Sequence, residues 1–261
     1  MKRNMSVAGT FYPRRAVELE RYFEHFSAIY DENFTLPEVN TRAIIVPHAG
    51  YIYSGYTANI AYRVLQKSSI KKFVVIGPSH KIAFDGISLC EFSSYDTPFG
   101  KISAIEDLAL KLKDKFSISC IKEAHFEHST EVQFPFLKHY IEDVSILELV
   151  YSYANAHYVS EIIDFVLQQP DAGVVISTDL SHFYNLGEAH RLDNICLTSI
   201  EKLDVGMLHS GCEACGNIGV EAMILSAKKL SLASHILDYR TSADASNDTS
   251  RVVGYTSAYF S

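Results

Sequence analysis

Three short apolar runs in this chain each lead into a loop that carries a histidine. The runs lie at 42–46, 72–76 and 173–177, and the histidines that follow them are His48, His80 and His182. Short β-branched runs bounded by Pro or Gly are typical of buried parallel strands. Parallel strands end at one edge of a sheet, and ligands of open α/β sheets bind at that edge. The sequence therefore predicts one site built from histidines that are far apart along the chain.

The other predicted elements alternate as in an α/β fold. Apolar residues at helical spacing predict helices around 16–30, 58–65, 106–116, 157–168, 190–203 and 218–230, and another that starts at Ser129 and is broken or kinked at Pro135. Further strands are predicted near 145–150, 236–240 and 252–260. Short strands at 87–92 and 101–105 flank a turn-rich stretch and predict a hairpin. The expected sheet is therefore mixed but mostly parallel.

Length and composition limit the class of protein. The chain has 261 residues, of which 48% are hydrophobic, and no linker divides it, so we expect a single domain over 1–261. The net charge of -8, with both signs interspersed, argues against nucleic acid as a partner. No signal peptide and no run long enough to span a membrane is apparent, which predicts a cytoplasmic protein.

The cysteines indicate thiols or metal ligands. There are five of them, and an odd number in a chain of this length does not suggest a disulfide framework. We expect Cys215 to face the cleft and Cys90, Cys120 and Cys196 to be packing residues, while the role of Cys212 stays open. Cys212 and Cys215 would supply only two of the four ligands that a structural zinc site needs. A dithiol redox motif is an alternative.

His48 and His80 are the strongest candidate ligands, because each follows a strand directly and lies in a turn shaped by Pro and Gly. Two imidazoles and one thiolate suit iron, copper or zinc, and three ligands leave coordination positions open for water or substrate.

The stretch from Ser177 to His182 combines hydroxyl, carboxylate and imidazole groups. Its residues are too close along one loop to form a catalytic triad, and they lack the nucleophile elbow of the hydrolases. We expect Asp179 to orient an imidazole and His182 to act as acid or base. At Glu127-His128-Ser129, a role in the site and a helix-capping role for Ser129 are both open.

Several motifs, in order along nearly the whole chain, resemble those of the Memo family, whose prokaryotic members are called AmmeMemoRadiSam system protein B. They are Gly9-Thr-Phe-Tyr-Pro13, Pro47-His-Ala-Gly-Tyr51, Gly77-Pro-Ser-His80, Glu127-His-Ser129, Ser177-Thr-Asp-Leu-Ser-His182, Cys215-Gly216 with Ile218-Gly219, and Gly254-Tyr-Thr-Ser-Ala258. The resemblance implies a three-layer α/β/α fold similar to the class III extradiol dioxygenases.

The resemblance also implies site residues. The metal ligands would be His48, His80 and Cys215, and the catalytic group would be His182 and Asp179, with His128 as a further candidate. A thiolate in place of the dioxygenases' carboxylate favours copper or redox-active iron, with zinc as an alternative.

Three functions follow as hypotheses. The first is a metal-dependent oxidoreductase, and the second is a non-enzymatic adaptor that binds a peptide or partner in the same cleft. A zinc hydrolase using the same ligands is a weaker third. We expect a small molecule or peptide in the cleft, and the resemblance implies a functional link to AMMECR1-like and radical SAM proteins.

Overall fold

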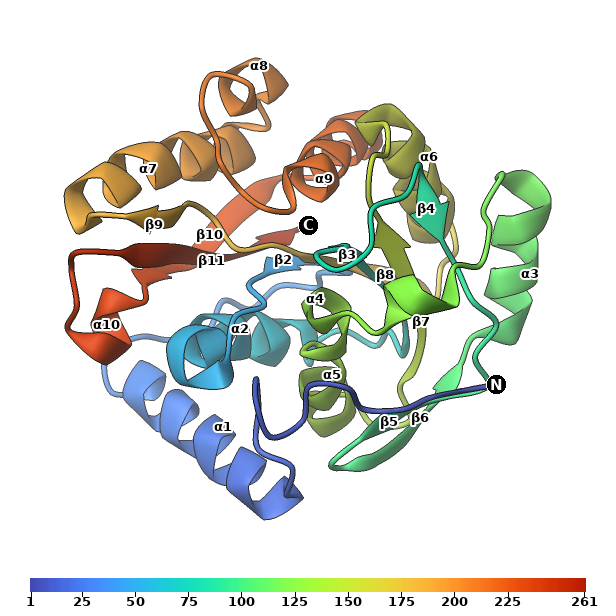
Figure 1. Cartoon of the computed structure of the whole chain (residues 1–261), viewed down its shortest axis with the longest axis horizontal. Coiled ribbons are helices and arrows are strands. Elements are labelled where there is room, and N and C mark those ends of the chain that lie inside the picture. The colour runs from blue at the N-terminus through green and yellow to red at the C-terminus, as the bar shows by residue number, and fades with distance from the viewer.

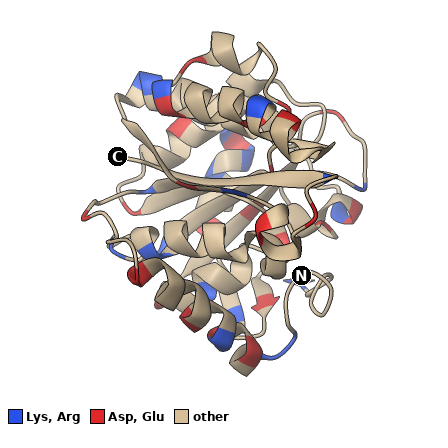
Figure 2. Cartoon of the chain, turned by 90° about the vertical axis from the view of Figure 1, so that its left-hand side faces the viewer, with Lys and Arg blue, Asp and Glu red and all other residues tan.

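The computed structural model describes residues 1–261 and has a three-layer α/β/α fold (Figure 1). Eleven strands form one mixed sheet, in the order β1-β5-β6-β7-β3-β8-β2-β11-β10, with β4 on β7 and β9 on β11. Figure 2 shows this sheet between two layers of helices. The fold class expected from the sequence is confirmed.

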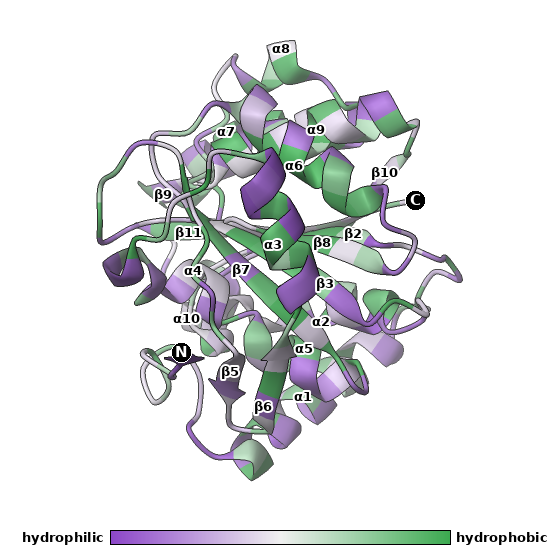
Figure 3. Cartoon of the chain, turned by 90° about the vertical axis from the view of Figure 1, so that its right-hand side faces the viewer, coloured by the Kyte–Doolittle hydropathy of each residue, from purple (hydrophilic) through white to green (hydrophobic).

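Four parallel strands form the centre of the sheet: β7 (Ser145–Tyr151), β3 (Lys72–Pro78), β8 (Ala172–Ser177) and β2 (Ala43–Val46). Nearly all of their residues are buried, because helices cover both faces. Figure 3 shows the hydrophobic colouring of these central strands. Since they run in one direction, the loops that follow them meet at one edge of the sheet.

Each face of the sheet carries its own hydrophobic core. Helices α1 (Ala16–Asp31), α2 (Tyr51–Leu65) and α5 (Phe134–Tyr140) pack on one face, in a cluster of 33 buried residues. Helices α3 (Glu106–Lys115), α6 (Ala156–Leu167) and α9 (Asn217–Leu230) supply much of a second cluster, of 31 residues. The apolar spacing of the sequence thus predicted these helices. The helix expected to start at Ser129 is broken, and Pro135 lies in the first turn of α5 rather than in its interior.

Smaller elements complete the fold. The helical ones are η1 (Lys122–His125), α4 (His128–Glu131), α7 (Leu186–Lys202), α8 (Val205–Leu208) and α10 (Ala243–Ser246). The strands are β1 (Lys2–Arg3), β4 (Ile87–Ser88), β5 (Ser94–Thr97), β6 (Gly100–Ala104), β9 (His182–Tyr184), β10 (Ser234–Thr241) and β11 (Val252–Phe260).

The predicted hairpin has a different first strand. The antiparallel partner of β6 is β5, which lies in the stretch expected to be a turn, whereas β4 pairs antiparallel with β7. Burial alternates along β5, with Tyr95 and Thr97 facing inward, and Gly100 takes a positive φ of 103° at the tight turn. This alternation is the strand signal that the turn residues around it obscured.

The expectation of free thiols was wrong for four cysteines. Cys90 is bonded to Cys120 and Cys196 to Cys212, which leaves Cys215 as the free thiol. Cys90 and Cys196 are also buried packing residues, as expected, whereas Cys120 is exposed. The cysteine argument for a reducing compartment therefore no longer holds.

None of the helices has the length and apolar character that crossing a membrane requires.

Candidate metal site

His48 follows β2 at the carboxyl edge of the sheet, and its ring is held by the end of β8. Its Nδ1 lies 2.9 Å from Oγ of Ser177. The Ser177 hydroxyl donates its one proton to the carbonyl oxygen of Ser129. Ser177 must therefore accept from His48 Nδ1–H, so Nε2 carries the lone pair. Burial, together with the charges of His80 and His128, lowers the pKa of His48 well below its ordinary value and keeps the ring neutral.

One buried carboxylate holds two further imidazoles. Oε1 of Glu127 lies 3.2 Å from Nδ1 of His80 and 2.7 Å from Nδ1 of His128. The same carboxylate accepts the backbone N–H groups of His80, at 2.7 Å, and of His128, at 2.8 Å. A carboxylate only accepts hydrogen bonds when ionised, so both rings donate from Nδ1, and in a neutral ring this leaves the lone pair on Nε2. This carboxylate–histidine arrangement is typical of metal ligands.

The hydrogen bonds also decide the ionisation of Glu127. Burial alone would raise the pKa of Glu127, but the hydrogen bonds from His128 and His80 outweigh it and hold that pKa far below its usual range. Glu127 also caps α4 by accepting from Ser129 N–H, whereas the Ser129 hydroxyl donates to the carbonyl oxygen of Pro78. The cap of this helix is thus Glu127 and not Ser129.

The three imidazoles converge. One nitrogen of each of His48, His80 and His128 lies within 4.8 Å of the others, which makes this group able to hold a metal ion. The ring centroids are 5.1 Å apart for His48 and His80 and 4.6 Å apart for His80 and His128. The strand-then-histidine pattern correctly brought His48 and His80 to one place, whereas the third ring of this group is that of His128 and not that of His182.

Cys215 enters the site from the loop before α9. Its Sγ lies 3.2 Å from Nε2 of His48 and 3.3 Å from the backbone nitrogen of Asp179. A Cβ on the next residue, Gly216, would lie 2.7 Å from Thr178, so glycine allows the loop to reach the end of β8. Burial, assisted by the negative charge of Asp179, raises the pKa of Cys215 to about 12. Without a bound cation the group is therefore a thiol.

Asp179 and His182 lie on the loop after β8. Asp179 accepts the backbone N–H of His48 at 2.7 Å, while its other oxygen is 3.9 Å from His48 Nε2. Asp179 therefore holds the backbone of His48 directly, whereas it is farther from the imidazole ring. Burial raises the pKa of Asp179. His182 begins β9 opposite Val253 and is close enough for its charge to contribute to lowering the pKa of His48.

A cavity of about 440 Å³ opens beside these residues. His80 and Cys215 line it together with Lys81, Tyr151 and Tyr153, so Cys215 faces the cleft as expected from the sequence. A small molecule in the cavity can therefore reach His80 and Cys215, two of the three candidate ligands.

Comparison with known proteins shows which family the chain is similar to. A sequence model of a family described as "Memo-like protein" matches residues 3–259. The chain belongs to the Memo family. It is 33% identical to a MEMO1 family protein of Aquifex aeolicus, over 99% of this chain and 98% of the relative. It is 32% identical to a MEMO1 family protein of Thermoplasma acidophilum, over 98% of each chain. It is also 32% identical to a MEMO1 family protein of Methanobrevibacter smithii, over the whole of each chain.

This Memo family chain also uses residues that sequence reasoning did not assign to the site. Glu127 and Ser177 orient the imidazoles, and Gln133 donates to Ser177 Oγ at 2.9 Å. Glu127 and Ser177 both lie within the motifs that carry the resemblance, which was the available signal. Gln133 lies outside those motifs, so only the fold could have revealed it.

The three imidazoles fit a metal ion, and the Cys215 thiol lies beside one of them, that of His48. Metal–nitrogen bonds of about 2.0 to 2.1 Å and metal–sulfur bonds of about 2.3 Å put two ligands of one ion roughly 3.2 to 3.6 Å apart. The 3.2 Å between His48 Nε2 and Cys215 Sγ falls at that spacing. The imidazoles are already oriented through Nδ1, so no large rearrangement of the chain is needed to present Nε2 to an ion.

Proposed function

We propose that this Memo family protein is a metal-dependent oxidoreductase whose ion is bound by His48, His80 and Cys215. Two observations support it: the imidazoles of His48, His80 and His128 converge at the carboxyl edge of the sheet, and the buried Cys215 thiol lies 3.2 Å from His48 Nε2, at the spacing of two ligands of one ion. Iron or copper is the expected ion, because a thiolate beside two imidazoles favours redox-active metals. Bound iron or copper would supply one-electron chemistry at the mouth of the cavity.

The protein's own groups would bind and move protons around that ion. Binding requires the Cys215 thiol to lose its proton, since the thiolate is the ligand. His182 is assigned to proton transfer with the substrate, and Asp179 holds the His48 backbone in place. His128 shares Glu127 with His80 and is a further candidate acid or base. A small molecule or peptide in the cavity would be the ligand.

Metal titration tests the ligand assignment. We would add iron(II), copper(I) or zinc separately to the wild type and to His48→Ala, Cys215→Ser, His128→Ala and the control His209→Ala. His209 is an exposed imidazole that also bonds a carboxylate, that of Glu221, but lies outside the site. We expect the first two variants to lose more than about 100-fold in affinity, because altering a group that merely supports a ligand costs about 10- to 100-fold.

The alternatives give different results. Equal binding by all five proteins would exclude this site and make the adaptor function the better proposal. Loss of metal in His128→Ala but not in Cys215→Ser would make His128 the third ligand. A sixth protein, His182→Ala, should keep its metal in this titration and lose redox turnover in a separate assay, and loss of metal from it would make His182 a ligand.

A further inference from the structure

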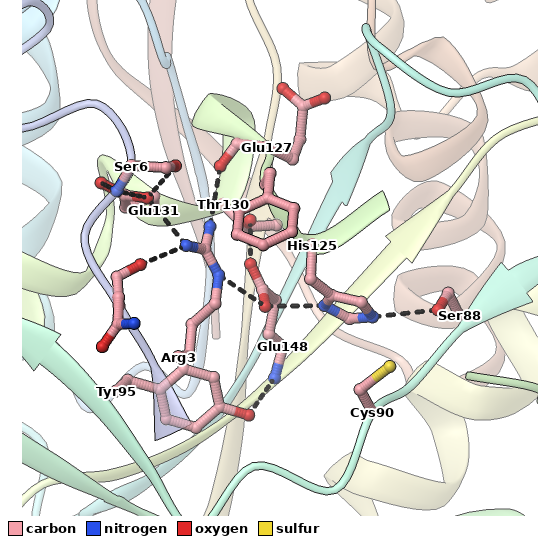
Figure 4. Close-up of polar contacts among 12 residues, drawn as sticks. Arg3, Ser6, Ser88, Cys90, Tyr95, His125, Glu127, Thr130, Glu131 and Glu148 are labelled. Carbon is pink, nitrogen blue, oxygen red and sulfur yellow. Dashed lines mark hydrogen bonds and ion pairs between the residues drawn. The ribbon is translucent and has the colours of Figure 1, made fainter. Parts of the chain in front are cut away.

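Arg3 is the second residue of β1 and is buried, with only 3% of its surface exposed. Each of its nitrogens has an acceptor. Nη1 lies 3.0 Å from the carboxylate of Glu131, Nη2 donates to the carbonyl oxygen of Glu127 at 3.1 Å, and Nε lies 3.4 Å from Glu148 (Figure 4). A buried charge is costly unless it is paired, and this one is paired with two carboxylates.

Two of these contacts act directly on the single helical turn that carries His128, and the third acts on it through Thr130. Glu127 is the residue before α4 and Glu131 is its last residue, so two nitrogens of Arg3 reach the two ends of the turn. The hydroxyl of Thr130, in the same turn, donates to the third partner, Glu148. A helix of four residues is far too short to be stable alone, so its position depends on what holds its ends.

The segment after Arg3 is bound to the same turn. The Glu131 carboxylate accepts the backbone N–H groups of Ser6 and Val7, each at 2.8 Å, and the Tyr12 hydroxyl at 3.0 Å. The Phe11 ring then packs on the His128 imidazole, with 4.5 Å between centroids. The segment from Arg3 to Tyr12 therefore packs against the turn that carries His128.

We infer that Arg3 is a positioning residue, which fixes Glu127 and α4 so that the two imidazoles bound to Glu127 point their Nε2 atoms at the ion. The inference rests on the proposed function for its metal readout. Arginine suits the role because its planar fork can serve three separate acceptors, whereas lysine would keep the charge but lose the fork. Arg3→Lys should therefore still neutralise the buried carboxylates but no longer position Glu127 and α4.

The test compares Arg3→Lys with Arg42→Lys. Arg42 is a matched control, because its guanidinium also serves several backbone carbonyl oxygens, those of Gln169, Leu167 and Ala172, but does so beside the amino end of β2. Cobalt(II) alone is the probe, since both its affinity and its visible spectrum report on the ligands. We expect Arg3→Lys to bind cobalt about tenfold more weakly and with an altered spectrum. Arg42→Lys should bind as the wild type does.

Amide hydrogen exchange at residues 128–132 gives a second readout that needs no metal. We expect faster exchange there in Arg3→Lys and no change in Arg42→Lys. Wild-type affinity, spectrum and exchange in Arg3→Lys would overturn the inference. If the wild type itself binds no cobalt, the proposed metal site fails, and unchanged exchange in Arg3→Lys would overturn the positioning role separately. Ser6→Ala, which removes one hydroxyl from Glu131, replaces Arg3→Lys if the latter does not fold.

Discussion

Two histidines in this protein are bound in the same way by a buried glutamate, yet only one of them is suited to bind a metal. His80 Nδ1 lies 3.2 Å from Glu127, and His125 Nδ1 lies 2.7 Å from Glu148. The rings differ at the other nitrogen. Nε2 of His125 is 2.9 Å from the hydroxyl of Ser88, whereas Nε2 of His80 has no hydrogen-bond partner in the chain, and its ring belongs to the group formed with His48 and His128.

The surroundings of the two rings match this difference. The His125 side chain is 1% exposed and lies in a closed network with Glu148 and Arg3 (Figure 4), while that of His80 is 32% exposed and lines the cavity. A carboxylate on Nδ1 therefore orients an imidazole in either case. Whether the ring contributes to stability or to chemistry depends on what its second nitrogen meets.

The largest expected effect comes from removing each ring in turn. His80→Ala should lose more than about 100-fold in metal affinity and little stability, since the ring is partly exposed and a ligand is lost. His125→Ala should keep its affinity within about threefold and lose about 1 to 3 kcal/mol of unfolding free energy, because Glu148 loses a buried partner. Metal titration and urea denaturation of both variants measure this. Equal loss of metal in the two would remove the distinction.

The disulfide near His125 should affect stability alone. Cys90 and Cys120 close a loop of 30 residues on the His125 side of the sheet, and cross-linking a loop of this length stabilises a protein by about 3 to 4 kcal/mol. We expect Cys90→Ser/Cys120→Ser to lose that much unfolding free energy while its metal affinity is unchanged. Thiol counting on the denatured, unreduced wild type is the control. One reactive thiol, Cys215, is expected, and five would show that the bonds do not form.

The smallest effect concerns acid stability. Burial alone would raise the pKa of Glu148, but the charges of Arg3 and His125 outweigh it and lower that pKa below its usual value. The carboxylate therefore contributes stability that is full above the unfolded pKa, near 4.5, and is lost as the pH falls from there toward the folded pKa.

Glu148→Gln should accordingly have a flatter dependence of unfolding free energy on pH below about 4.5, by at most about 1.4 kcal/mol per pH unit. Denaturation at several pH values measures the slope, and Glu142→Gln, at an exposed carboxylate, is the control. The same slope in wild type and Glu148→Gln would mean that Glu148 is not ionised in the folded protein at these pH values.

Local sequence determined much of this protein. The β-branched runs before His48 and His80 predicted buried parallel strands, and strand direction alone then put both histidines at one edge. Helical spacing predicted α1, α3, α6 and α9, because periodicity records which side of an element is buried. The motifs around His48, His80 and Cys215 were sufficient to indicate the family, which the comparisons confirmed.

The partners of these side chains were decided by the tertiary structure. Glu127 binds an imidazole 47 residues earlier, and Arg3 reaches Glu127 and Glu148 across 124 and 145 residues. No periodicity records such contacts, because they depend on how the helices and strands pack and not on the pattern within any one of them. The disulfides were missed for the same reason, whereas β5 was missed because turn residues obscured its alternation. The sequence thus predicted where the histidines meet, and the packing of the chain decided which nitrogen each one presents.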